Sequence, residues 1–212
     1  MATDGRLDLV VVRHGLTAWN RERRYQGHRD IPLLLPDAEL GLALLRDALS
    51  HVSFDAIDCS DLVRCRQTLG YIRPDSIDPE PCFDARLREL NFGEYEGRTY
   101  NDLKSIPAYR AWIETRGEQA PPQGESAAAL RARLDAWFEH RVTQCDPGRQ
   151  QHVLVVSHGG VIRELRRRFE AIDFWEGDTG QAQGRHFIFH YQRGAWRCSS
   201  SSAVPAPASD TR

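Results

Sequence analysis

Four short motifs contain the residue types in this sequence that could do chemistry together. Each lies in a loop or just beyond the end of an expected strand: R-H-G-x-T-x-x-N at 13–20, D-L-x-R-C-x-Q-T at 61–68, R-E-L-x-F-G-x-x-E-G at 88–97 and S-H-G-G at 157–160. Between them they supply two imidazoles, two guanidinium groups and a carboxyl group: His14, His158, Arg13, Arg64 and Glu89. These are the residue types of a phosphoryl-transfer site.

The chemistry expected of these groups follows from their ordinary properties. A neutral imidazole is a nucleophile near neutral pH, because its usual pKa is about 6.5. The planar fork of an arginine suits phosphate oxygens, so two arginines can neutralise the transferred group without a metal ion. The leaving alkoxide needs a proton, which Glu89 could supply if burial or phosphate charge kept it protonated. Gly15 leaves room beside the His14 ring, and its carbonyl could fix the ring's tautomer.

Each residue also has a structural interpretation when it is taken alone. Arg64 near a helix start could be a surface charge, Glu89 a salt-bridge partner and His158 a hydrogen-bonded core histidine. Asn20 could be only a turn residue or a helix cap. The joint occurrence of the motifs in this order favours the catalytic interpretation, most strongly for His14.

Strands and helices alternate along the chain, and this alternation indicates how the motifs are positioned. Apolar runs predict strands, and apolar residues at helical spacing predict helices. The expected strands are 7–13, 54–60, 152–157 and a closing pair made by HFIFHY and WRCS; the expected helices are 37–52, 61–72, 99–117 with a break at Pro107, 125–142 and a helix after 160. This pattern predicts a three-layer α/β/α sandwich with a largely parallel central sheet. Ligands bind such sheets beyond the carboxyl ends of the strands, where three of the motifs should meet.

With these motifs in this order, the sequence resembles the histidine phosphatase superfamily, also called the phosphoglycerate mutase-like family. The resemblance covers about residues 7–197, and it implies a phosphoryl-transfer enzyme in which His14 becomes phosphorylated. It implies that Glu89 donates the proton to the leaving group, although Glu94 and Glu96 compete for that role on sequence alone.

The resemblance also implies which residues surround the phosphoryl group. Arg13, Arg64 and His158 take part in catalysis with His14 and Glu89. The implied substrate- and phosphate-binding residues are Arg13, Asn20, Gln26, Gly27, Arg64, His158 and Gly159. It implies no cofactor and no metal ligand.

The family holds both phosphatases and mutases, and the sequence favours a phosphatase. Cofactor-dependent mutases carry a longer, basic segment where this chain has ETRGEQAPPQGES, in which Arg116 is the sole basic residue. The F-G-x-x-E-G form at 92–97 is similar to the phosphatase branch, which includes α-ribazole phosphatases. We therefore expect a phosphomonoester hydrolase that acts on a small phosphorylated metabolite through a phosphohistidine. The alternatives are a cofactor-dependent phosphoglycerate mutase and a non-catalytic phosphate-ligand binder, which would be expected to lose His14 or Glu89.

Some positions depart from the common family pattern. Leu16 stands where a glutamate is frequent, and LLLPDAELG at 33–41 lacks the usual hydroxyl cap of the following helix. The segment DTGQAQGR at 178–185 is a candidate for shaping the mouth of the site. We expect the run RRR at 166–168 to be a solvated helix face.

Composition limits the other classes of function. A net charge of −2 argues against nucleic-acid binding, which needs a basic excess. The five cysteines are scattered and form no C-x-x-C pair, so they indicate neither a zinc site nor a disulfide framework. No apolar run reaches the roughly 20 residues of a membrane span, and no signal-peptide pattern precedes the first strand. We expect a cytoplasmic protein without a membrane partner.

The expected domain organisation is simple. Residues 1–198 are predicted to form one catalytic domain, and the small polar and proline residues at 199–212 a disordered tail. The stretch HFIFHYQRGAW at 186–196 could offer an exposed strand edge, which is compatible with a homodimer.

Overall fold

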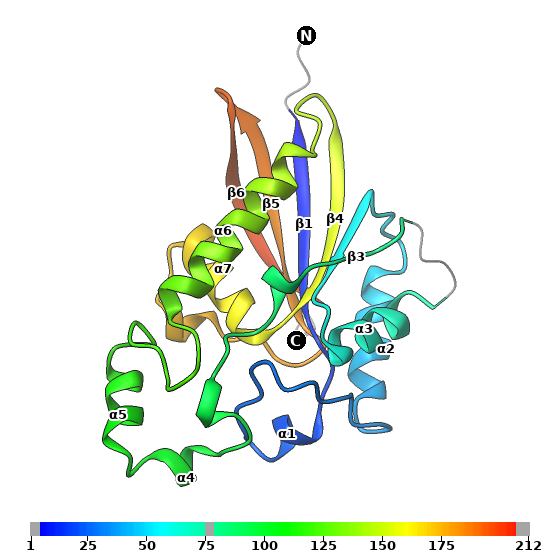
Figure 1. The fold of residues 1–212 in the computed structure, drawn as a ribbon. Coiled ribbons are helices and arrows are strands. Elements are labelled where there is room, and N and C mark those ends of the chain that lie inside the picture. Colours follow the sequence, from blue (N-terminus) through cyan, green and yellow to red (C-terminus); the bar gives the residue numbers. More distant parts are fainter. Residues whose placement is uncertain (1–4, 75–78, 207–212) are drawn as a thin grey trace, which may run out of the picture.

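The protein is built around one six-stranded sheet, seen in the computed structural model, which describes residues 5–74 and 79–206 (Figure 1). The strands lie in the order β3-β2-β4-β1-β5-β6. The first four of these run parallel, β5 is antiparallel to β1, and β6 is antiparallel to β5. The strand bounds are β1 Arg6–Arg13, β2 Ala56–Cys59, β3 Cys82–Phe83, β4 Gln150–Ser157, β5 Gly184–Gln192 and β6 Ala195–Val204.

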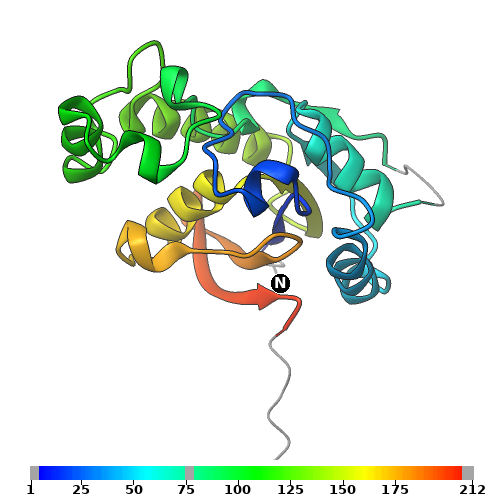
Figure 2. The same ribbon diagram turned by 90° about the horizontal axis from the view of Figure 1, so that it is seen from below.

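Helices cover both faces of the sheet, with α2 and α3 on one side and α6 and α7 on the other (Figures 1 and 2). The helix bounds are α1 Ala18–Arg21, α2 Glu39–Leu49, α3 Val63–Ile72, α4 Tyr100–Leu103, α5 Pro107–Glu114, α6 Ala127–Thr143 and α7 Gly159–Glu170. Short 3₁₀ turns are η1 Ala85–Leu87, η2 Gly93–Tyr95 and η3 Phe174–Gly177. The predicted three-layer α/β/α arrangement with a largely parallel sheet is confirmed.

The central strand β1 is buried on both faces, as its continuous apolar run indicates. Because side chains alternate along a strand, Leu9 and Val11 pack in the core beneath α6 and α7, whereas Val10 and Val12 pack in the core beneath α2 and α3. The strand is therefore held from both sides up to the point where its polar motif begins.

The register of the sheet brings three motifs to one edge. Arg13 at the end of β1 lies opposite Ser157 at the end of β4. Cys59 at the end of β2 lies opposite Val156 in β4. The carboxyl ends of β1, β2 and β4 therefore deliver R-H-G, C-S-D-L-V-R and S-H-G-G to the same place, as expected for a parallel sheet.

Two segments differ from the expectation in length. The helical tendency at 99–117 is divided into α4 and α5, and Pro107 is the first residue of α5, where its missing N–H is not needed. The last strand does not end at residue 198, because β6 pairs with β5 as far as Val204. The predicted start of a disordered tail at 199 is therefore wrong, and residues 207–212 of that tail lie outside the described residues.

Two surface expectations also change. Most of the stretch 186–196 does not form the sheet edge, since β5 lies between β1 and β6; its last two residues, Ala195 and Trp196, begin the edge strand β6. The expected solvated face at 166–168 holds for Arg167 and Arg168, which are exposed, but all three arginines also have partners. Arg166 pairs with Glu170 at 3.0 Å, Arg167 pairs with Glu164 at 2.7 Å, and the guanidinium of Arg168 lies over the ring of Phe138.

The missing cap at the start of α2 is confirmed. Its N-cap residue is Ala38, which makes no side-chain hydrogen bond to the helix. In the described part of the chain, no helix combines the length and the apolar character that crossing a membrane requires.

Candidate active site

His14 lies at the end of β1 with its orientation fixed by backbone groups. Its N–H donates to the Ser157 carbonyl at 3.0 Å, and the ring Nδ1 lies 2.7 Å from the Gly15 carbonyl oxygen. Because a carbonyl only accepts, Nδ1 carries the proton and the lone pair is on Nε2. The expected role of the Gly15 carbonyl in fixing this tautomer is confirmed.

Burial, together with the positive charges of Arg64 and Arg13, lowers the pKa of His14 well below 6.5. All three effects disfavour the imidazolium, so the neutral form persists as the pH falls. An unperturbed histidine is about 90 % protonated at pH 5.5, whereas we expect His14 of the free protein to stay neutral there. Titration of the imidazole nitrogen resonances by NMR measures this directly, and a His14 signal that titrates around 6.5 would contradict it.

Two arginines flank His14 without an ion pair. Within the described residues neither Arg13 nor Arg64 lies within 4.0 Å of a carboxylate oxygen, although Arg64 is fully buried. The Nε groups of both are buried and have no hydrogen-bond acceptor in the protein. Burial lowers the pKa of both guanidinium groups, but arginine remains charged. A fully buried and a half-buried cation, both without a carboxylate partner in the described chain, make a site for an anion.

Other N–H groups of these two arginines donate to backbone carbonyls of the surrounding loops. Arg64 donates from Nη1 to the carbonyl of Arg29 at 2.7 Å and from Nη2 to that of Gly27 at 2.8 Å. Arg13 donates from Nη1 to the carbonyl of Thr179 at 2.6 Å. Each guanidinium is therefore fixed in place before any ligand arrives.

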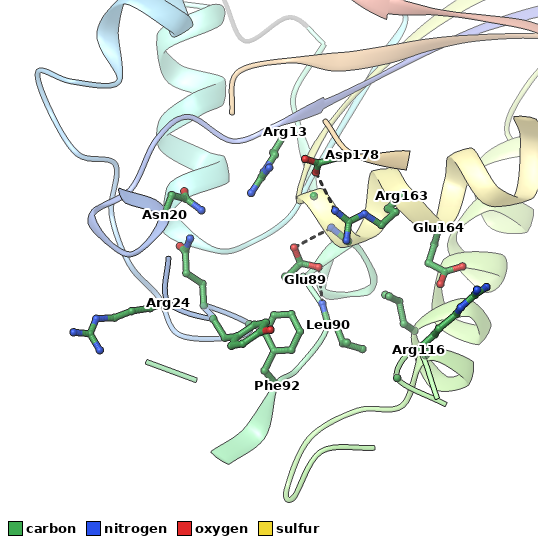
Figure 3. A pocket seen from close by; sticks show the side chains of 18 of the residues that line it. Arg13, Asn20, Arg24, Glu89, Leu90, Phe92, Arg116, Arg163, Glu164 and Asp178 are labelled. Carbon is green, nitrogen blue, oxygen red and sulfur yellow. Dashed lines mark hydrogen bonds and ion pairs between the residues drawn. The ribbon is translucent and has the colours of Figure 1, made fainter. Parts of the chain in front are cut away.

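Glu89 is held against the N-terminus of α7. Its Oε1 accepts the Leu90 N–H at 2.9 Å and its Oε2 accepts the Gly160 N–H at 3.0 Å. A Cβ on Gly160 would come within 2.2 Å of Oε1, so only glycine allows this approach. Figure 3 shows Glu89 at the same end of the cavity as Arg13.

The two competing carboxylates have other functions. Glu96 accepts the backbone N–H groups of His28 and Phe92, at 2.8 and 3.2 Å, and so supports the loop around Gly27. Glu94 is exposed and bonds to Gln123. Neither lines the cavity that contains His14, whereas Glu89 does, which supports Glu89 as the acid.

His158 lies behind His14 and does not line the cavity. The two rings are 5.3 Å apart between centroids in an edge-on arrangement, and His158 is fully buried. Its Nε2 is 2.8 Å from the Ser60 hydroxyl oxygen and 3.4 Å from the Cys65 sulfur. Burial, Arg64 and His14 lower the pKa of His158 well below 6.5, so this imidazole is also neutral.

We expect Ser60→Ala to lower kcat about tenfold with little change in KM, because it leaves a buried ring nitrogen without its hydroxyl partner. Ser60→Thr keeps the hydroxyl and should recover most of the loss. Nitrogen chemical shifts of His158 report its tautomer, which should change in Ser60→Ala. Wild-type kcat and an unchanged tautomer in Ser60→Ala would show that Ser60 has no positioning role.

The other expected phosphate-binding residues also line the cavity. Asn20 does cap α1, since its Oδ1 accepts from the N–H of Thr17, but it faces the cavity as well. The side-chain oxygen of Gln26 accepts from the Thr17 hydroxyl at 3.0 Å. Gly27 has a φ of +52°, and a Cβ there would meet Glu96 at 2.0 Å. Gly159 packs on Arg13, so a Cβ would lie 3.1 Å from its Cζ.

The sequence reasoning missed Arg163, which lines the cavity from α7. It donates to Asp178 at 3.0 Å, and Asp178 lies in the segment that was expected to shape the mouth (Figure 3). One signal was available, because Arg163 is four residues after Gly159 and must share its helix face. Among residues 5–74 and 79–206, no group of three or more His, Cys, Asp or Glu side chains could hold a metal ion.

The comparisons with known proteins agree with this geometry. Residues 9–203 match the Histidine phosphatase superfamily (branch 1). The chain belongs to the histidine phosphatase superfamily. Similar members include phosphoglycerate mutase-like protein 4 of Arabidopsis thaliana, 32 % identical over 76 % of this chain and 70 % of that protein. Adenosylcobalamin/alpha-ribazole phosphatase of Salmonella typhimurium is 33 % identical over 76 % of this chain and 78 % of that protein.

Solved structures of superfamily members share the fold. The alpha-ribazole phosphatase from Shigella flexneri superposes with a TM-score of 0.74 at 26 % identity, covering 92 % of this chain and 94 % of that one. A phosphoglycerate mutase from Bacillus anthracis superposes with a TM-score of 0.75 at 24 % identity, covering 94 % of each chain, and shows likeness of fold alone. The curated relatives themselves carry names of both kinds, a phosphatase and a phosphoglycerate mutase-like protein.

Proposed function

We propose that this histidine phosphatase superfamily member is a phosphomonoester hydrolase that acts on a small phosphorylated metabolite through a phosphohistidine at His14. The observation that carries this proposal is that Arg13 and Arg64 both have a buried Nε–H group without an acceptor among the residues described, beside a neutral, tautomer-fixed imidazole. An anion is the ligand that these groups lack, and phosphate is the anion that such a histidine can attack.

In the first step Nε2 of His14 attacks phosphorus while the bond from phosphorus to the ester oxygen breaks. The arginines neutralise the charge on the equatorial oxygens, and Glu89 gives its proton to the departing oxygen. The alcohol leaves, and the Nδ1–H bond to the Gly15 carbonyl stabilises the phosphorylated ring.

In the second step a water molecule attacks the phosphohistidine. The Glu89 carboxylate accepts a proton from that water as the phosphorus–nitrogen bond breaks, which returns Nε2 as a neutral nitrogen and releases orthophosphate. The N–H of Gly159 at the start of α7 completes the surroundings of the phosphoryl group, and His158 supports the His14 ring from behind. Two arginines supply the positive charge, so we propose that the reaction is metal-independent.

A panel of phosphomonoesters tests the proposal. Orthophosphate release should be measured in the presence of EDTA from 3-phosphoglycerate, a sugar phosphate, phosphoserine, α-ribazole phosphate and p-nitrophenyl phosphate. Mass spectrometry of alkali-quenched samples should detect phosphate on His14, and acid treatment should remove it, because phosphohistidine is acid-labile and stable in alkali. Release from at least one ester supports a phosphatase.

The alternatives give different results in the same experiment. A cofactor-dependent phosphoglycerate mutase would interconvert 3- and 2-phosphoglycerate after priming with a bisphosphoglycerate and release little orthophosphate. A non-catalytic binder would never carry phosphate on histidine. The cytoplasmic location and a homodimer remain predictions from the sequence.

A further inference from the structure

The cavity that contains His14 has two chemically different ends. It has a volume of about 310 Å³, and its inner end carries the arginines, Glu89 and the start of α7. Its outer end is lined by apolar side chains, and Figure 3 shows two of them, Leu90 and Phe92, at the end opposite Arg13. This apolar wall consists of Tyr25, Leu90, Phe92, Trp112, Ile113 and Leu130.

The aromatic part of the apolar wall is fixed before a ligand binds. The ring of Tyr25 lies 4.9 Å from that of Phe92 and 5.7 Å from that of Trp112, between centroids, and Phe92 and Trp112 are 5.9 Å apart. The hydroxyls of Tyr25 and Tyr109 are hydrogen-bonded at 2.7 Å. An apolar group can therefore enter without the wall having to become ordered, which avoids one of the usual costs of binding.

The charges around the outer end are already paired. Apart from Arg13 and Arg64, the arginines that line the cavity have carboxylate partners: Arg24 with Glu22 at 2.5 Å, Arg116 with Asp173 at 2.8 Å and Arg163 with Asp178 at 3.0 Å. The carboxylates of Asp178 and Glu164 also line the cavity, and each is paired with an arginine of α7. A leaving group with a carboxylate or a second phosphate would therefore meet carboxylates and committed arginines.

The apolar wall offers little to a polyhydroxy alcohol. The Tyr25 hydroxyl is bonded to Tyr109, and the Trp112 indole N–H has no hydrogen-bond partner within the described part of the chain, but its nitrogen is buried from solvent. Sugar hydroxyls that entered this end would lose water without gaining partners, which is unfavourable. An aromatic ring loses no hydrogen bond on the same surface and gains contact with three rings.

We propose that the alcohol released by this enzyme is apolar and aromatic rather than a sugar or a hydroxy acid. The proposal rests on the phosphatase function above, since it assigns the group that the ester oxygen carries. The transferred phosphate would lie between Arg13 and Arg64, and the ring of the alcohol against Phe92, Trp112 and Ile113.

Benzyl phosphate, ethyl phosphate and 3-phosphoglycerate test this in the wild-type protein. Benzyl alcohol and ethanol leave as alkoxides of similar basicity, so a difference between their esters reports recognition of the ring. We expect kcat/KM for benzyl phosphate to exceed that for ethyl phosphate by about 10- to 100-fold, the effect of burying a phenyl group. We expect 3-phosphoglycerate to be a poorer substrate than ethyl phosphate.

A charge placed on the apolar wall gives a second test. Ile113 is half-buried near the end of α5, and Ile113→Arg puts a guanidinium into the outer end of the cavity. We expect the ratio of benzyl to ethyl kcat/KM to fall to about one and the relative rate with 3-phosphoglycerate to rise. Ala108→Arg adds the same charge to an exposed position of α5 that does not line the cavity, and it should leave both ratios unchanged.

The outcomes separate this inference from the proposed function. Hydrolysis of p-nitrophenyl phosphate that depends on His14, with benzyl phosphate no better than ethyl phosphate or with 3-phosphoglycerate preferred, would overturn the aromatic assignment and leave the phosphatase intact. Absence of hydrolysis for every ester, p-nitrophenyl phosphate included, would overturn both. The comparison of benzyl phosphate, ethyl phosphate and 3-phosphoglycerate uses the wild-type protein. It therefore tests the proposal even if Ile113→Arg does not fold.

Discussion

The His14→Ala protein is expected to lose at least about 10⁴-fold in kcat/KM for every phosphomonoester, because removal of a covalent nucleophile leaves only binding and charge stabilisation. Arg13, Arg64 and Glu89 keep their backbone and loop contacts in this variant, so the phosphate pocket remains. Orthophosphate release and the phosphoenzyme signal should disappear together. Competition by orthophosphate in a binding assay should persist.

His140→Ala is the matched control, since His140 is an exposed histidine on α6. It should retain wild-type rates and the phosphoenzyme signal. Substantial hydrolysis by His14→Ala, or phosphate found on another residue, would mean that the nucleophile has been assigned wrongly. Loss of activity in both variants would instead point to a defect in folding, which thermal unfolding curves would reveal.

Glu89→Gln is expected to reduce kcat/KM by about 10²- to 10⁴-fold for alkyl phosphates, whose leaving alkoxides need a proton. The loss should be below about tenfold for p-nitrophenyl phosphate, because its phenolate leaves without protonation. The ratio kcat/KM is the informative quantity, since it reports phosphohistidine formation and not the later attack by water. Equal losses for both esters would contradict the role of Glu89 as the acid in the first step.

Glycine substitutions test the same carboxyl group without removing it. In Gly160→Ala the new Cβ would overlap Glu89 Oε1, so the carboxylate must move and the alkyl-phosphate rate should fall as in Glu89→Gln. Gly70→Ala also adds a methyl group to a helical glycine, but nothing lies within 4 Å of that Cβ. This control should keep full activity and gain stability, because alanine favours a helix interior.

The central site was predictable because its residues follow strong local patterns. The apolar runs before Arg13 and Ser157 specify strands buried on both faces, and parallel strands with buried faces end at one edge of a sheet. The position of His14 therefore depends on backbone pairing that the sequence indicates directly. The two short helices around Pro107 follow in the same way from a residue that cannot sit inside a helix.

The features that were missed depend on contacts between distant segments. The serines at 199–202 have no pattern of a strand by themselves, yet β5 supplies hydrogen-bond partners that extend β6 to Val204. Arg163 was visible as a helix residue, but its pairing with Asp178 depends on where the loop after η3 passes. Arg166 is half-buried through its pair with Glu170 on the same helix, and the exposed Arg168 lies over Phe138, which α6 brings to it.

The hydrogen bonds from Arg64 to the carbonyls of Gly27 and Arg29 also bear on turnover. They already hold the loop around Gly27 against the phosphate pocket in the unliganded protein, so orthophosphate binds without any further ordering of that loop. Orthophosphate, the last product, has the charge and shape of the transferred group, so we expect it to bind the same arginines. Product inhibition by orthophosphate should therefore be competitive, and the surrounding orthophosphate concentration would set how fast the enzyme runs.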